Sequence, residues 1–252
     1  MAQQLFILTG GSRGMGAAMA AQLLAQGHAL ISIARTSNPA LSALADSTRL
    51  VQWEHDLASP AAAALHLEAY LSELHGSGRA LTALSLINNA GVISRPGPVE
   101  YSADGDLANA LRVGLEAPVL ICAAFLRATE GWAIPRRILN ISSGLGRRAM
   151  AGSAAYCAAK AGMDHFSRAV ALDEARKLHG ARICSLAPGV IDTDMQIQLR
   201  SADLSQFPDG RNFIALKEGG KLWSPQEAAC KVLAYLDRPD FGKEPVADVR
   251  DA

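Results

Sequence analysis

Two side chains four residues apart, Tyr156 and Lys160, are the groups in this sequence best suited to moving a proton. They fall in a stretch with helical spacing, where residues i and i+4 share one face. A phenol with a pKa of about 10 is a poor acid-base catalyst at neutral pH. A cation ~4 Å away at an effective dielectric of ~20 is worth ~4 kcal/mol, or about three pKa units. The pair therefore predicts either a phenol with a lowered pKa or an ordinary amphipathic surface pair.

A glycine-rich turn, TGGSRGMG at residues 9–16, follows the first short apolar run, and a helical pattern begins inside it. A helix N-terminus at the carboxyl edge of a parallel sheet attracts anions, and glycines let a pyrophosphate approach the backbone. A tight turn without a ligand is the alternative. The position between a strand, a helix and a second strand favours a dinucleotide site.

The elements that must hold these residues alternate along the chain. The apolar runs predict strands at residues 5–9, 29–34, 49–53, 83–87, 137–141, 181–186 and 245–249. The helical patterns cover residues 13–26, 60–75, 104–131, 153–178 and 225–236. Ser59 is the expected N-cap of the pattern at 60–75, with Pro60 at its first helical position, and Ser224 is the expected N-cap of the pattern at 225–236.

The predicted strands are nearly all apolar, as expected for strands covered on both faces. Strand and helix in alternation predict an α/β fold, a Rossmann-like doubly wound parallel sheet of about seven strands with helices on both faces. We expect residues 1–252 to form a single NAD(P)-binding domain. The long mixed segment 190–223 is the expected substrate loop or lid.

The amino-acid composition excludes some classes of binding partner. Lys plus Arg and Asp plus Glu both total 24 in 252 residues, so zero net charge argues against nucleic acid and anionic membranes. The longest apolar run, 117–126, is about half the ~20 residues of a membrane span, and the first residues do not resemble a signal peptide. Four cysteines without a C-x-x-C motif suggest reduced thiols in a cytoplasmic protein. The six histidines show no metal-ligand spacing, so no metal is expected.

Three motifs together resemble the short-chain dehydrogenase/reductase family over nearly the whole chain. They are the G-x-x-x-G-x-G spacing at residues 10–16, NNAG at residues 88–91, and Tyr156-x-x-x-Lys160. The resemblance implies hydride transfer between a nicotinamide cofactor and a carbonyl carbon. It implies that Ser143 hydrogen-bonds the carbonyl, with Ser142 as a rival, that Tyr156 transfers the proton, and that Lys160 lowers the Tyr156 pKa and binds the ribose.

The cofactor positions also follow from the resemblance. They are Gly10, Ser12, Arg13, Gly14, Met15, Gly16, Arg35, Asp56, Leu57, Asn89, Ala90, Gly91, Tyr156, Lys160, Pro188, Gly189, Ile191 and Thr193. An acidic residue at the end of the second strand would select NAD(H). This sequence has Arg35 there and a second cation at Arg13, so we expect NADP(H), although either arginine could be a solvated surface charge.

One position departs from the family pattern. Gly114 stands where the family usually has an asparagine that supports a water chain to the lysine. A glycine preserves space for a helix bulge but has no side-chain amide. We expect water to substitute or the proton relay to be slower.

The carboxyl third is similar to sepiapterin reductases and related bacterial benzil reductases. This similarity implies reduction of a ketone or vicinal diketone, or of a pterin side chain, with substrate contacts from Ser143, Tyr156, Met195 and Asp248. Asp251 is the rival of Asp248. Alternatives are a short-chain dehydrogenase for an unrelated alcohol or ketone and a catalytically weak NADP-binding regulatory protein. Apolar surface on the two longest predicted helices suggests a homodimer or homotetramer.

Overall fold

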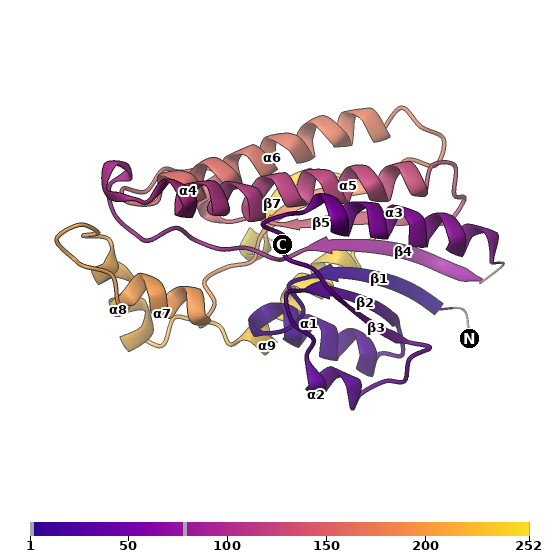
Figure 1. Ribbon diagram of the computed structural model, residues 1–252, viewed down its shortest axis with the longest axis horizontal. Helices are drawn as coiled ribbons and strands as arrows, with labels where there is room; N and C mark the ends of the chain where they lie inside the picture. Colours follow the sequence, from indigo (N-terminus) through magenta and orange to yellow (C-terminus); the bar gives the residue numbers. More distant parts are fainter. Residues whose placement is uncertain (1–2, 78–79, 252) are drawn as a thin grey trace.

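Seven parallel strands form the centre of the computed structural model, which describes residues 3–77 and 80–251 (Figure 1). They are β1 (Gln3–Thr9), β2 (Ala29–Ala34), β3 (Leu50–Glu54), β4 (Leu81–Asn88), β5 (Arg136–Ile141), β6 (Arg182–Ala187) and β7 (Val246–Asp248). Their order in the sheet is β3-β2-β1-β4-β5-β6-β7. The winding therefore reverses between β1 and β4, which is where ligands bind in sheets of this kind. The predicted Rossmann-like doubly wound sheet is confirmed.

Helices cover both faces of the sheet. They are α1 (Gly14–Ala25), α2 (Pro39–Ser42), α3 (Ala61–Gly76), α4 (Asp104–Leu111), α5 (Ala117–Ala128), α6 (Ala154–Glu174), α7 (Asp194–Arg200), α8 (Gly210–Glu218) and α9 (Pro225–Leu236). Figure 1 shows α3, α5 and α6 along one face, while α1 and α9 lie along the other. The short α2 was not predicted.

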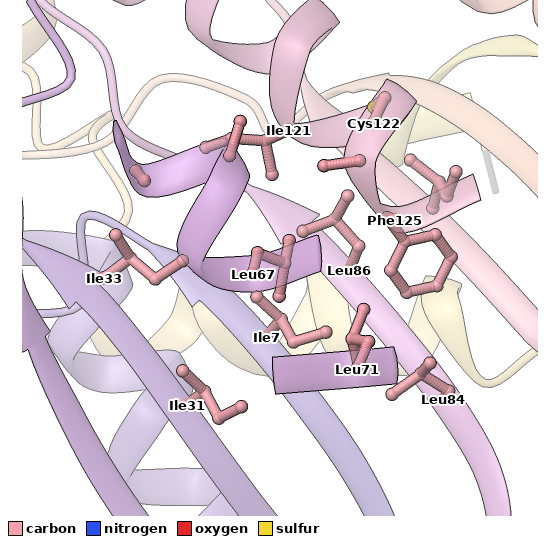
Figure 2. Close-up of a cluster of buried hydrophobic side chains, with 14 of the residues drawn as sticks. Ile7, Ile31, Ile33, Leu67, Leu71, Leu84, Leu86, Ile121, Cys122 and Phe125 are labelled. Carbon is pink, nitrogen blue, oxygen red and sulfur yellow. The ribbon is translucent and has the colours of Figure 1, made fainter. Parts of the chain in front are cut away.

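The two faces of β1 explain why its residues 5–8 are all apolar. Leu5 and Ile7 belong to the core under α3 and α5, whereas Phe6 and Leu8 belong to the core under α1 and α9. Successive side chains of a strand point to opposite faces, so a strand covered on both faces has no polar alternation. Figure 2 shows Ile7 beside Leu67 and Leu71 of α3, in the same buried cluster as Phe125 of α5.

The predicted helix at 104–131 is interrupted and ends earlier. A π-helical turn, Arg112–Glu116, separates α4 from α5, and α5 ends at Ala128. Gly114 lies in this turn, where an added Cβ would sit 3.0 Å from the Cβ of Ala159. The glycine therefore allows the widened turn to pack closely against α6.

The whole stretch Asp104–Ala128 is long and apolar enough to cross a membrane by length and composition, with 50% of its most apolar window buried in the fold. It is the one such stretch among residues 3–77 and 80–251. Ala117, Ile121 and Phe125 are each 0% exposed, against the sheet and α3. These contacts make it a core helix of this fold.

Other helix boundaries differ from the predicted ones. Pro60, rather than Ser59, occupies the N-cap position of α3: the Pro60 carbonyl accepts the first helical hydrogen bond, from the Ala64 amide, and no side chain caps this helix. The helix predicted at 153–178 ends at Glu174, where a series of turns begins. The Glu174 carboxylate accepts a hydrogen bond from the Ala181 amide and so joins the end of α6 to the start of β6. The predicted cap of α9 is confirmed, with Ser224 and Glu227 forming a reciprocal capping box.

The predicted substrate loop, residues 190–223, contains α7 and α8. A bridge between Ile191 and Trp223 closes its base, and the Asp192 amide donates to the Trp223 carbonyl at 2.9 Å. The segment is therefore a compact helical cover anchored at both ends. The sequence predicted its position but not its helices.

Candidate active site

Loops at the carboxyl ends of the strands line one pocket of about 740 Å³. Every cofactor position named from the sequence lies on its wall, together with Ser143, Lys160 and Met195. Parallel strands bring these loops to the same sheet edge, although they are far apart in the chain. A volume of this order is typical of small-molecule and cofactor sites.

The glycine-rich turn after β1 is held in place by Asn89, which follows β4. The Asn89 side-chain amide donates to the carbonyls of Thr9 and Gly10, at 3.0 and 3.2 Å. An added Cβ at Gly16 would lie 2.0 Å from the Gly10 oxygen, so the helix can approach the turn only with a glycine there. The first-turn amides of α1 receive no side-chain cap and remain available to an anion. This geometry suits the pyrophosphate of a dinucleotide.

The two arginines expected at the cofactor lie together at a second, smaller pocket. Ser12, Arg13, Arg35 and Thr36 line it. The Arg13 guanidinium also forms an ion pair with Asp194 at 2.8 Å, with both side chains about two-thirds exposed at 68% and 67%. The sequence did not predict this pair, which links the glycine turn to the start of α7.

The structure separates the two serines that follow β5. Ser142 is buried and donates a hydrogen bond to the Asp164 carboxylate at 2.6 Å. Ser143 is half-buried, lies on the pocket wall, and accepts a hydrogen bond from the Leu145 amide at 3.1 Å. A hydrogen bond with Ser143 also acts to lower the pKa of Tyr156. Ser143 is therefore the serine placed to meet a substrate.

The prediction that Lys160 lowers the Tyr156 pKa is wrong when only the groups of the protein itself are present, because the Tyr156 pKa is raised. Burial raises the pKa of Tyr156 to about 12, because removing the phenolate from water outweighs the hydrogen bond with Ser143. The Lys160 ammonium donates to the Ile141 carbonyl at 2.7 Å and lies 5.6 Å from the centre of the Tyr156 ring. Burial also lowers the pKa of Lys160 to about 8, with the Asp164 carboxylate opposing the shift.

Asp164, one helical turn after Lys160, was missed in the sequence and ties this region together. It is 1% exposed and accepts hydrogen bonds from Ser142 at 2.6 Å and from Ser185 of β6 at 2.7 Å. Its second oxygen lies 3.4 Å from the Arg147 guanidinium. An added Cβ at Gly146 would lie 2.7 Å from that oxygen, so the loop can come this close only with a glycine. The available signal was an acidic residue on the apolar face of the helix that carries Lys160.

The expected substrate contact required Asp248 to lie on the pocket wall, but the described wall does not include it. Asp248 is 9% exposed at the end of β7, and the Arg250 side chain binds both of its oxygens, at 2.8 and 2.6 Å. Asp251 is also absent from the described pocket wall, whereas Arg250 lies on it. The Asp248 carboxylate, which the sequence analysis assigned to the substrate, is therefore bound to the Arg250 guanidinium instead.

Two further observations concern chemistry that the sequence left open. Gly114 supplies no amide, but Asn109, on the preceding helix α4, lies on the pocket wall. No group of three or more His, Cys, Asp or Glu side chains that could hold a metal occurs among residues 3–77 and 80–251.

The fold, the pocket and its Ser, Tyr and Lys side chains define a nicotinamide-dependent oxidoreductase of the short-chain type. The chain belongs to the short-chain dehydrogenase family, whose profile, described as short chain dehydrogenase, matches residues 4–204. It is 35% identical over 239 residues to a benzil reductase ((S)-benzoin forming) of Bacillus cereus, covering 93% of this chain and 94% of that protein. It is 31% identical over 248 residues to the sepiapterin reductase of Meriones unguiculatus, covering 93% and 92%.

Among solved structures, the chain resembles a short-chain dehydrogenase/reductase from Burkholderia vietnamiensis. The TM-score is 0.67 at 36% identity, covering 99% of this chain and 98% of that one. The predicted resemblance to the family, and within it to benzil and sepiapterin reductases, is confirmed.

The buried Asp164 network predicts a difference in stability between two substitutions. Asp164→Ala leaves two buried hydroxyls without their acceptor and Arg147 without its carboxylate, so we expect a loss of about 3 kcal/mol in the free energy of unfolding. Asp164→Asn should lose less, because an amide oxygen still accepts from both hydroxyls. Urea denaturation measures both.

The matched control is Asp173→Ala, an exposed aspartate on the same helix, which should change stability by less than about 0.5 kcal/mol. If Asp164→Ala were as stable as this control, the network would not contribute to the fold.

Proposed function

We propose that the chain is an NADPH-dependent carbonyl reductase that converts a ketone or vicinal diketone into a secondary alcohol. The observation that carries the proposal is that Ser143, Tyr156 and Lys160 share one pocket with every expected cofactor position. The names of the similar proteins, benzil reductase and sepiapterin reductase, support the same class of reaction.

The preference for NADPH is supported by the charge at the end of β2. Arg35 occupies the position where an acidic residue would accept hydrogen bonds from a ribose hydroxyl and repel a phosphate. Arg35 lines one small pocket together with Ser12, Arg13 and Thr36. Guanidinium groups bind phosphate with two parallel hydrogen bonds, so this set suits a 2′-phosphate.

Arg35→Asp should reverse the cofactor preference. The new carboxylate would repel the phosphate of NADPH and accept hydrogen bonds from the ribose of NADH, so the ratio of kcat/KM for NADPH to that for NADH should fall by at least about 100-fold. Steady-state kinetics with each cofactor measures the ratio.

Arg176→Asp is the control, because Arg176 is exposed and lies outside the described pocket wall. An unchanged preference for NADPH in Arg35→Asp would remove Arg35 from cofactor selection.

The mechanism assigns a separate task to each side chain. A nicotinamide cofactor, when bound, would supply the hydride for the carbonyl carbon. Ser143 donates a hydrogen bond to the carbonyl oxygen and to the negative charge that develops there. Tyr156 then transfers its hydroxyl proton to that oxygen. Lys160 provides a buried cation beside the Tyr156 ring, held by the Ile141 carbonyl, in position for the ribose.

The raised Tyr156 pKa keeps the phenol in the protonated form that reduction requires, but it also makes the phenol a weaker acid. With a pKa of about 12, the phenol keeps its proton at neutral pH and serves as the acid without prior protonation. Oxidation of an alcohol would instead require the phenolate as a base. Positive charge from the oxidised nicotinamide would have to stabilise that phenolate against the cost of burial.

Tyr156→Phe should lower kcat for reduction by at least about 100-fold, the lower range for a positioned general acid, with little change in NADPH binding. The ring and its packing remain, so the variant tests the hydroxyl alone. Loss of NADPH absorbance with benzil as substrate measures kcat, and fluorescence titration measures NADPH binding.

Tyr101→Phe, at a tyrosine that is 71% exposed, is the corresponding control. Turnover by Tyr156→Phe close to that of the unaltered protein would exclude Tyr156 as the acid. If the unaltered protein bound NADPH tightly but no carbonyl substrate oxidised the NADPH, the alternative of a regulatory NADP-binding protein would be favoured. The missing side-chain amide at Gly114 supports that alternative.

We also propose that the protein is cytoplasmic and forms a homodimer or homotetramer through the layer of α3 to α6. Four free cysteines support a reducing compartment.

Leu65 of α3 and Leu172 of α6 are 68% and 69% exposed, and burying such leucines against a second copy would remove apolar surface from water. Sedimentation velocity should show a dimer or tetramer that Leu172→Glu weakens; a monomer at every concentration would contradict the oligomer.

A further inference from the structure

We propose that Arg250 and Arg148 make the substrate end of the pocket a site for a carbonyl compound that also carries a carboxylate group. The inference rests on the proposed reductase function and names its class of substrate. Both arginines lie on the wall of the pocket that contains Ser143 and Tyr156.

Arg250 is fixed in place by Asp248. The carboxylate accepts hydrogen bonds from the Arg250 backbone amide at 3.0 Å and from its side chain at 2.8 and 2.6 Å. These bonds use Nε and Nη2 of the guanidinium. Within the part of the chain that the structure describes, Nη1 forms no hydrogen bond or ion pair and remains available as a donor. A donor fixed in this way loses little freedom when it binds a ligand.

The same contacts remove Asp248 as an acceptor for substrate. Hydrogen bonds from Arg250 hold the pKa of Asp248 below its ordinary value, so the group stays ionised and committed to the guanidinium. Arg147 approaches it as well, at 4.0 Å. An aminopyrimidine ring needs an acceptor for its N–H groups, whereas this wall presents N–H donors. The wall therefore suits a ligand rich in oxygen acceptors.

Arg148 adds a second cation from the loop that begins at Ser143. Its backbone amide donates to the Gly144 carbonyl at 3.1 Å, which fixes the loop, and its side chain is exposed on the pocket wall. No hydrogen bond or ion pair engages this guanidinium among residues 3–77 and 80–251. Its neighbour Arg147 donates to the Ala247 carbonyl at 2.7 Å, so the loop and the end of β7 that leads to Arg250 lie side by side.

The acidic groups of the substrate loop do not cancel this charge. Asp192 and Asp194 lie on the same pocket wall, but Asp192 is paired with Lys217 and Arg200, and Asp194 is paired with Arg13. Guanidinium groups bind carboxylates through charge-assisted hydrogen bonds in a planar, often bidentate geometry. A carboxylate on the substrate is the complementary group.

A matched pair of substrates tests the inference. Phenylglyoxylate and its methyl ester present the same ketone, with and without a carboxylate. For the unaltered protein with NADPH, we expect kcat/KM for the acid to fall as salt is raised, while that for the ester changes little. The ratio of kcat/KM for acid to ester should fall at least tenfold in Arg148→Met and in Arg250→Met. Arg176→Met is the control with the same change in charge on an exposed side chain outside the pocket.

Arg148→Met leaves the Asp248 pair intact, so it keeps the test decisive if Arg250→Met folds poorly. An acid-to-ester ratio that is the same in Arg148→Met and the unaltered protein, or no reduction of the acid while the ester is reduced, would overturn the inference.

Calorimetric binding of phenylglyoxylate to the NADPH-loaded protein separates the two proposals. Binding that Arg148→Met weakens at least tenfold, without turnover of either ketone, would support the anion site and refute the reductase function. Reduction of the ester without binding of the acid would do the reverse.

Discussion

The buried carboxylate of Asp164 is the interaction on which the active-site geometry most depends. It accepts one hydrogen bond from Ser142, which follows β5, and another from Ser185, which lies in β6. It also forms an ion pair with Arg147, from the loop after Ser143. A carboxyl group with almost no access to water is tolerated only when such partners surround it. One side chain on α6 therefore fixes the distance between the helix that carries Tyr156 and Lys160 and the strand end that carries Ser143.

The sheet sets where this arrangement can occur. Because the strands are parallel and the winding reverses between β1 and β4, the glycine turn, the Asn89 loop and the Ser143 loop meet at one edge. Asn89 binds the glycine turn through the carbonyls of Thr9 and Gly10, so this turn and the loop after β4 form one hydrogen-bonded unit. The apolar residues on both faces of the strands hold that edge in place.

Charged side chains are distributed unevenly along this pocket, although the chain as a whole has a net charge of zero. Arg13 and Arg35 lie at one small pocket, while Arg148 and Arg250 lie on the wall that includes Ser143. On the same wall, burial raises the pKa of Tyr156 and lowers the pKa of Lys160. The pocket therefore combines a protonated phenol with four arginines on its wall.

The sequence by itself determined what local chemistry controls: the alternation of strands and helices, the glycine turn, the Ser224 cap, and the motif residues that line the pocket. Tertiary structure decided what depends on competition among distant groups. Asp248 has a suitable side chain for substrate, but Arg250 binds it first. The Tyr156 pKa follows burial, which spacing along a helix does not reveal, and Ser142 differs from Ser143 only because Asp164 lies beside it. Helix ends shifted for the same reason, since contacts such as that of Glu174 with Ala181 come from elements that local patterns do not contain.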